Sequence, residues 1–182
     1  MPGFSIHIAV AKEYIRKNKV KDEQELIRGV IDPDYISLTD KEKSKNITHY
    51  GEWGDWSGKP QGIDLQRFLK DPKVDLNEDY WKGYFIHLYT DYYFGRKYFH
   101  EETIKAKQNG ESFYNDYDCL NEYIIKKYDI QIMDKIKKYL QTSKDETKYL
   151  KQEKVEKFIE DMSNIDLEQF AEKIMKNGME EL

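Results

Sequence analysis

The stretch that decides the fold is Gly83–His100, GYFIHLYTDYYFGRKYFH. It is crowded with aromatic and branched apolar side chains, as expected for a helix built to be buried. His87 and Asp91 nevertheless occur in it four positions apart, which places them one turn apart on the same face of a helix. Most of the aromatic stripe is interpreted as core. An imidazole and a carboxylate on one face of such a helix indicate a polar site.

The bulk composition is that of a globular protein. Charged residues make up 36% of the 182 residues, but 15 Tyr, 8 Phe and 3 Trp supply apolar area for a core. The net charge of −5 argues against a broad nucleic-acid surface, although it allows an enzyme that binds one nucleotide or phosphate group. The single cysteine, Cys119, excludes an intrachain disulfide framework and fits a reducing compartment. With no signal-like N-terminus and no transmembrane segment, a cytoplasmic protein is expected.

Helical periodicity runs through almost the whole chain, so the predicted fold class is all-α, a multi-helix bundle. Ser5 is expected to cap the first helix, and Asp22 the second, which Asp32-Pro33 should end. We expect a helical metal-binding domain over 1–140 and a charged C-terminal helical extension over 141–182. The helices of that extension offer a surface for a homo-oligomer. Further helices are expected over 64–70, 79–107, 115–128 with an extension over 130–140, 145–162 and 166–177.

Candidate metal ligands are spread over the first half of the chain. Asp34 follows a proline in GVIDPD, and His49 lies in the THYG segment. Together with His87 and Asp91 they would supply two imidazoles and two carboxylates, a set that neutralises a divalent cation. Such a set suits zinc, with manganese or iron as alternatives. His7 is placed to serve a second metal ion or to orient the ligands of the first.

Each of these features also has a structural interpretation. A His–Asp pair at i and i+4 is more often an ordinary hydrogen-bonded pair than a metal site. His100, followed by two glutamates, is interpreted as solvated helix surface, and so is the Lys/Glu-rich run over 144–157. Asp116 or Asp118 in YNDYD could join a site, but the same segment fits a helix N-cap.

The order MPGFSIH, GVIDPD, THYG and GYFIHLYTDYYF resembles the zinc-dependent phospholipase C and P1-type nuclease superfamily, in particular its short intracellular relatives of the phospholipase C group. The resemblance covers about the first 100 residues. It implies an all-α bundle that holds up to three zinc ions in a cleft. One zinc would be bound by four residues at the matching positions, and His7 would serve a second zinc that shares Asp91 with the first. The four residues are Asp34, His49, His87 and Asp91.

The sequence departs from the family pattern at two points. Secreted members use an N-terminal tryptophan as a ligand, whereas the first motif here starts with Met1-Pro2. A third zinc would need a further histidine and a later His/carboxylate pair, and only His100 remains, at an unfamiliar spacing. We therefore expect one zinc ion, leave a second open, and do not expect the full cluster.

These residues predict a metal-dependent phosphoesterase, phospholipase C-like or nuclease-like, that uses a metal-activated water. The resemblance implies that Asp34 serves as general base or orienter as well as ligand. Trp53, Trp56 and Lys59 are expected to contact the substrate, with Lys59 or Arg96 on its phosphate; the alternative is a hydrophobic plug over the core. A small phosphoester, a lipid headgroup and a nucleotide all remain open as substrates.

Two other classes of protein fit parts of the pattern. A non-catalytic helical interaction protein with a vestigial or structural metal site would explain the shortened ligand set and the charged C-terminal segment. An HD-type phosphohydrolase would also be helical and metal-dependent, but the sequence has no adjacent His-Asp doublet.

Overall fold

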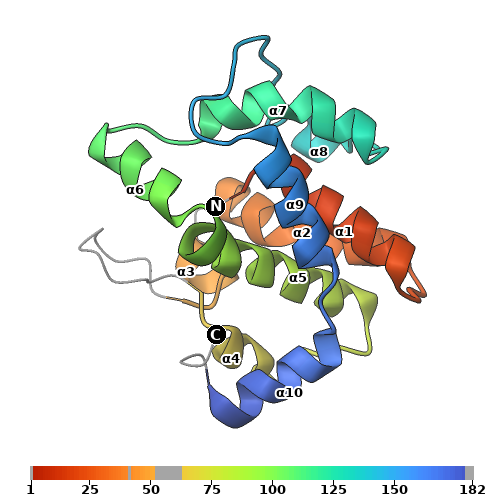
Figure 1. Cartoon of the computed structure of the whole chain (residues 1–182). Helices are drawn as coiled ribbons and strands as arrows, with labels where there is room; N and C mark the ends of the chain where they lie inside the picture. The colour runs from red at the N-terminus through yellow and green to blue at the C-terminus, as the bar shows by residue number, and fades with distance from the viewer. Residues whose placement is uncertain (1, 41, 52–62, 179–182) are drawn as a thin grey trace. The chain divides into compact units, whose positions relative to one another are not determined.

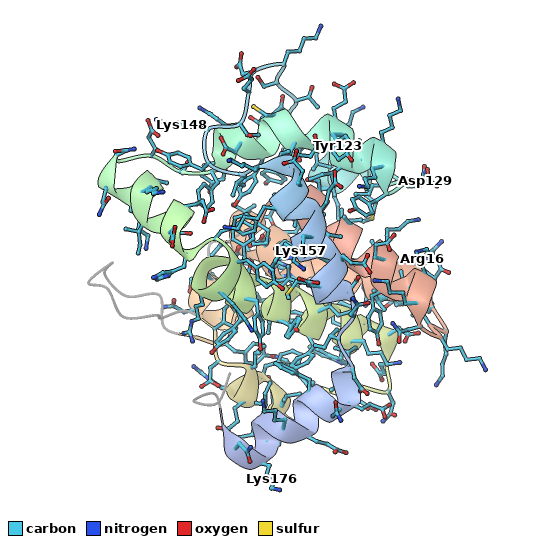
Figure 2. The ribbon with its side chains drawn as sticks, viewed as in Figure 1. Arg16, Tyr123, Asp129, Lys148, Lys157 and Lys176 are labelled. Atoms are coloured by element: carbon cyan, nitrogen blue, oxygen red, sulfur yellow. The ribbon has the colours of Figure 1, made fainter. Side chains whose placement is uncertain are left out.

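The computed structural model describes residues 2–40, 42–51 and 63–178, and its regular structure is entirely helical within these residues (Figure 1). This confirms the all-α prediction. Charged side chains such as Arg16 and Lys176 point outward from the helices (Figure 2). None of the described helices combines the length and the apolar character needed to cross a bilayer. The elements are α1 Phe4–Lys17, α2 Glu23–Thr39, α3 Lys45–Thr48, α4 Leu65–Leu69, α5 Asp79–Tyr93, the π-helical turn η1 Phe94–Tyr98, α6 His100–Gln108, α7 Tyr114–Lys127, α8 Asp134–Lys137, α9 Gln152–Ser163 and α10 Leu167–Asn177.

The helices form two compact units. The first, called the α1 unit, comprises residues 1–17 and 90–164, and the second, called the α2 unit, comprises residues 18–89 and 165–182. Helix α5 passes from the α2 unit into the α1 unit between Tyr89 and Thr90. These units group the residues differently from the expected domains at 1–140 and 141–182. The expected division at residue 140 concerns which part of the chain folds independently, and it stays a prediction.

A close approach of α2 and α5 organises the α2 unit. A Cβ atom added at Gly29 would lie 1.9 Å from the carbonyl oxygen of Tyr80, and one added at Gly83 would lie 2.0 Å from that of Leu26. Neither distance is compatible with a side chain larger than hydrogen. The two backbones therefore touch at these glycines. Aromatic rings surround the crossing: Phe68 of α4 stacks on Tyr84 of α5 with ring centroids 5.5 Å apart.

Helix α2 does not end at Asp32-Pro33, so the sequence-based stop is wrong. Asp22 caps the helix as expected, but the helix continues through Pro33 to Thr39. A proline inside a helix costs roughly 3 kcal/mol because it removes one hydrogen bond and crowds the preceding turn. Burial outweighs this cost, since Val30 and Ile31 are fully buried and α3 packs against α2. Asp34 is therefore a helical residue.

Asp79 anchors the start of α5 to the start of α2. Its Oδ2 atom accepts hydrogen bonds from the backbone amides of Lys21 and Asp22, at 2.8 and 2.7 Å, and its Oδ1 lies 2.9 Å from the ammonium of Lys82. Although burial by itself raises the pKa of this carboxyl, the bonds from Lys82 and the two amides outweigh it. The pKa of Asp79 lies below its ordinary value.

In the α1 unit, α1 packs against both α9 and α7. The Lys17 ammonium at the end of α1 lies 2.8 Å from Glu160 and from Ser163 of α9. Ser5 is not an N-cap, because α1 already begins at Phe4. Its buried hydroxyl instead donates a 2.6 Å hydrogen bond to the Asn121 side chain of α7.

Three further helix predictions need correction in the α1 unit. The helix expected over 79–107 is interrupted by η1 and by Phe99, whose φ of −120° and ψ of 32° are not helical. The extension over 130–140 contains only the short α8, and the helix expected over 145–162 begins at Gln152. The segment before α9 is ordered by Asp116, whose carboxylate accepts three backbone amides at 2.6–2.9 Å. Asp116 is therefore a structural carboxylate rather than an N-cap.

The glycine crossing predicts a steep cost for adding one methyl group. Gly83→Ala should destabilise the protein by about 3 kcal/mol, since overpacking a tight contact costs 1–3 kcal/mol or more. Gly95→Ala is the matched control, because a Cβ there meets no atom within 4 Å. Urea unfolding followed by circular dichroism measures both variants. Equal midpoints for the two variants would contradict the proposed contact.

Asp79 predicts a pH-dependent contribution to stability. Because its folded pKa is depressed, the carboxylate stabilises the fold above its unfolded pKa, and this stabilisation is lost as the pH falls through the folded value. Asp79→Asn should cost about 2 kcal/mol at neutral pH, as expected for hydrogen bonds to a charged group. The difference from the unmodified protein should shrink below about pH 4. Urea unfolding midpoints of both proteins, measured from neutral pH to below about pH 4, test this prediction. A stability difference between them that does not change with pH would exclude the ionic contribution.

Candidate metal centre

His87 lies on α5 one turn after Gly83, so it projects from the face of α5 that touches α2. Its ring is fully buried, and its Nδ1 atom lies 2.7 Å from the carbonyl oxygen of Val30 in α2. A carbonyl only accepts hydrogen bonds, so Nδ1 must carry the proton. In a neutral ring the lone pair then resides on Nε2. Histidines that bind metals through Nε2 are held by this kind of contact.

His49 lies at the C-terminal end of α3, and its ring is also fully buried. Its Nε2 atom is 3.2 Å from the Nε2 atom of His87, and the two rings meet edge to face with centroids 5.2 Å apart. On the other side of the ring, Nδ1 lies 2.8 Å from the hydroxyl of Thr48. The hydroxyl can donate or accept, so this contact permits either tautomer of His49.

Asp34 supplies the third candidate ligand atom within the α2 unit. Its Oδ1 lies 3.5 Å from Nε2 of His49, and a ligand atom of Asp34 lies within 4.8 Å of one of His87. Tetrahedral ligands at about 2.0–2.1 Å from zinc lie roughly 3.4 Å from one another. The two shorter distances in this cluster, 3.2 and 3.5 Å, match that spacing. The spacing around His49 therefore fits a small divalent ion.

Two contacts fix the approach of α3 to α5 and the environment of Asp34. The hydroxyl of Tyr84 on α5 donates a 2.6 Å hydrogen bond to the carbonyl oxygen of Thr48 on α3. Burial raises the pKa of Tyr84 far above its ordinary value, so the hydroxyl keeps its proton. Lys45 of α3 places its ammonium 2.9 Å from Oδ1 of Asp34. Its side chain is 30% exposed and that of Asp34 10%, so this edge of the cluster faces solvent.

The α1 unit holds the other predicted ligands. His7 on α1 and Asp91 on α5 are both buried, and Nε2 of His7 lies 3.2 Å from Oδ1 of Asp91. His7 and Asp91 thus form a close pair. Asp91 follows His87 by one turn along α5. Whether the pair joins the ligands of the α2 unit stays a prediction.

The remaining predicted site residues fall elsewhere. Trp53, Trp56 and Lys59 lie outside the described residues. Arg96 is in η1, where its guanidinium stacks 4.3 Å from the ring centre of Tyr92. His100 is exposed at the start of α6, as expected for solvated surface.

Sequence reasoning missed Lys45, Thr48 and the carbonyl of Val30. Lys45 precedes His49 by four positions and Thr48 precedes it by one, so a helix assigned over 45–48 would have placed both beside His49. Four residues are too few for a periodicity signal. A backbone carbonyl has no sequence signature at all.

Comparison with known proteins identifies no relative of this chain. No protein-family model, no curated protein and no solved structure matches the chain significantly.

Proposed function

We propose that the protein is a metal-dependent phosphoesterase whose metal is held in the α2 unit by Asp34, His49 and His87. The observation that carries the proposal is the Val30 carbonyl on Nδ1 of His87, which leaves the Nε2 lone pair directed at His49 from 3.2 Å. Two lone pairs facing at that distance repel each other unless a proton or a cation lies between them. Zinc is the proposed ion, since imidazole and carboxylate are ligands that it accepts.

The charge of the cluster suits an anionic substrate. With both imidazoles neutral, the charge of Asp34 is balanced by that of Lys45, so a divalent ion would leave the cluster positive. A bound divalent ion supplies an acidified water and a Lewis acid for a phosphoryl oxygen. In the proposed reaction, Asp34 at the solvent-facing edge would accept a proton from the attacking water. Lys45 is placed to meet an anionic oxygen of the phosphoester.

A metal-free arrangement defines the competing interpretation. If Nε2 of His49 carries a proton, it donates to Nε2 of His87, and the hydroxyl of Thr48 donates to Nδ1 of His49. Every contact is then an ordinary hydrogen bond. A structural metal without hydrolysis is the other alternative, and it corresponds to a non-catalytic interaction protein. Metal content and hydrolysis therefore have to be measured separately.

Removal of His87 provides the first test. The purified protein should carry about one zinc ion per chain, and His87→Ala should weaken zinc binding by more than about a hundredfold, the upper range for loss of a mere supporting contact. His100→Ala is the control, because His100 is exposed on α6. Elemental analysis and competition with a chromophoric chelator measure binding, and cleavage of bis(4-nitrophenyl) phosphate measures activity.

The conservative variant Asp34→Asn distinguishes loss of a metal ligand from loss of folding, which could also explain the effect of His87→Ala. It should keep the helical circular dichroism signal while losing zinc affinity and hydrolysis. Zinc binding that survives in both variants would overturn the proposed ligands. Zinc binding without hydrolysis in the unmodified protein would instead favour the structural metal.

Thr48 provides a second test, which concerns the tautomer of His49. Zinc binding through Nε2 requires Nδ1–H to donate to the Thr48 hydroxyl, so Thr48→Val should weaken zinc binding by about tenfold or more. Thr39→Val is the control, since among the described residues its hydroxyl bonds only to the carbonyl of Tyr35 at the end of α2. Chelator competition gives both affinities. Unchanged affinity in Thr48→Val would show that this hydroxyl does not set the tautomer.

A further inference from the structure

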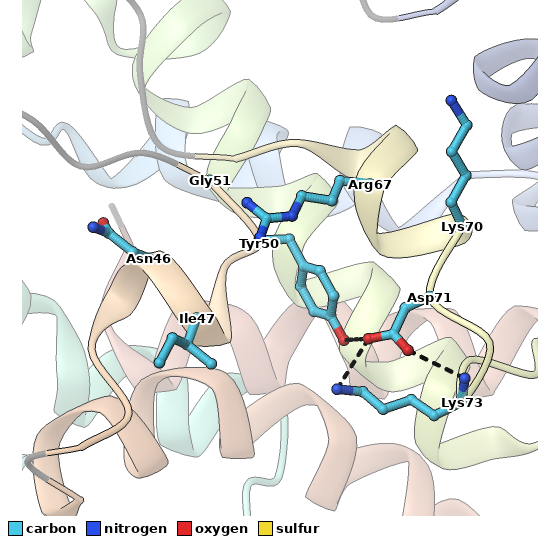
Figure 3. Close-up of a pocket in the computed structure, with 8 residues that line it drawn as sticks. All are labelled: Asn46, Ile47, Tyr50, Gly51, Arg67, Lys70, Asp71 and Lys73. Atoms are coloured by element: carbon cyan, nitrogen blue, oxygen red, sulfur yellow. Dashed lines mark hydrogen bonds and ion pairs between the residues drawn. The ribbon is translucent and has the colours of Figure 1, made fainter.

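A second feature of the α2 unit is an open pocket of about 570 Å³, separate from the metal ligands. A volume of this size accommodates a small organic ligand. Its walls come from α3, from the turn after His49, and from α4 with the residues that follow it (Figure 3). The lining residues are Asn46, Ile47, Tyr50, Gly51, Arg67, Lys70, Asp71 and Lys73.

The lining is positively charged in a chain whose net charge is −5. Among the lining residues that the structure describes, three are cationic and one is a carboxylate, and that carboxylate is already engaged: Asp71 accepts from the Tyr50 hydroxyl at 2.9 Å and pairs with Lys73 at 3.0 Å. Among the described residues no carboxylate pairs with the side chain of Arg67 or of Lys70. Two cationic charges are therefore left over, which matches a dianion.

The rigid part of the pocket is Tyr50. Its φ of 56° is rare for a bulky residue and is held by the buried ring and by the hydrogen bond to Asp71. Burial raises the pKa of Tyr50, so its hydroxyl stays a donor to Asp71. The ring of Tyr50 packs edge to face on Phe68, which ties the pocket wall to the core.

The arrangement of the side chains separates a polar from an apolar part. In Figure 3 the guanidinium of Arg67 reaches toward the Tyr50–Gly51 backbone, Lys70 at the rim points upward and away from that guanidinium, and Asn46 projects from α3 on the opposite side. A guanidinium presents a fork of donors that fits phosphate oxygens. Ile47, 56% exposed, supplies an apolar surface on the α3 side.

We propose that this pocket binds the phosphate group of a small phosphorylated organic molecule, with Arg67 and Lys70 on the phosphate and the Ile47 side on the organic part. The site needs no metal, so it does not depend on the proposed hydrolase activity. Its position in the chain directly after His49 would allow a phosphorylated effector to act on the α3 segment that carries this ligand.

Phenyl phosphate and inorganic phosphate are the probes, titrated at constant ionic strength into chelator-treated protein. Chemical shifts of the backbone amides of Gly51 and Arg67 report the location of binding. Phenyl phosphate should bind saturably and more tightly than inorganic phosphate. The double variant Arg67→Gln/Lys70→Gln should weaken its binding by about tenfold or more, as expected for lost charge-assisted hydrogen bonds.

Lys173→Gln/Lys176→Gln is the matched control. It removes the same charge with the same spacing from exposed positions on α10, and neither lysine lines the pocket. The control should change the affinity by less than about twofold, because exposed charges outside the pocket are screened by salt. Equal loss in both double variants would reduce the effect to net charge and overturn the site. The absence of saturation below about 10 mM would also overturn it.

His87→Ala separates this proposal from the metal centre. Phosphate binding that persists in His87→Ala supports the pocket, even if the protein proves to bind no zinc. Binding that disappears in His87→Ala but survives in Arg67→Gln/Lys70→Gln would place the phosphate at the histidines and overturn the pocket.

Discussion

The close approach of the α2 and α5 backbones, at Gly29 against Tyr80 and at Gly83 against Leu26, is the constraint on which the α2 unit depends. It lets the backbones of α2 and α5 touch, and it thereby brings a carbonyl of one helix onto a histidine ring of the other. The next turn of α2 carries Asp34. Hydrogen bonds weaken steeply beyond their normal range of about 2.7–3.2 Å, so a separation larger by one ångström would break the link to His87. The close approach of the two backbones therefore determines both the packing of α2 on α5 and the geometry of the candidate metal centre.

Local sequence rules predict the helix starts that depend on one side chain. Asp22 and Asp64 both accept amide hydrogen bonds as N-caps, and Gly178 ends α10 with a positive φ. The rules fail where tertiary burial decides. Pro33 should stop α2, but the apolar residues around it are buried and the helix continues. The turn η1 in the middle of the aromatic stretch has no local signal, because its residues also fit an α-helix.

The sequence predicts the residue types of the candidate site but not the contacts that orient them. The spacing to Asp91 predicts His87 as a site residue, and the order of motifs in the chain predicts Asp34 and His49. The distances between these residues, 3.2 and 3.5 Å around His49, follow only from the three-dimensional structure. The contacts that orient the ligands come from a backbone carbonyl and from a threonine next to His49, which resemble countless others in any sequence. The basic pocket likewise joins two short segments separated by the undescribed residues 52–62.

The number of residues between each glycine and the candidate ligand on the same helix offers a way to recognise distant relatives. Gly83 precedes His87 by one helical turn, and Gly29 precedes Asp34 by five positions across Pro33. Both intervals are fixed by the geometry of the crossing rather than by the chemistry of the surrounding surface. A pattern that combines a glycine, its ligand and the interval between them on two helices could thus detect homologous chains whose remaining residues have diverged beyond alignment.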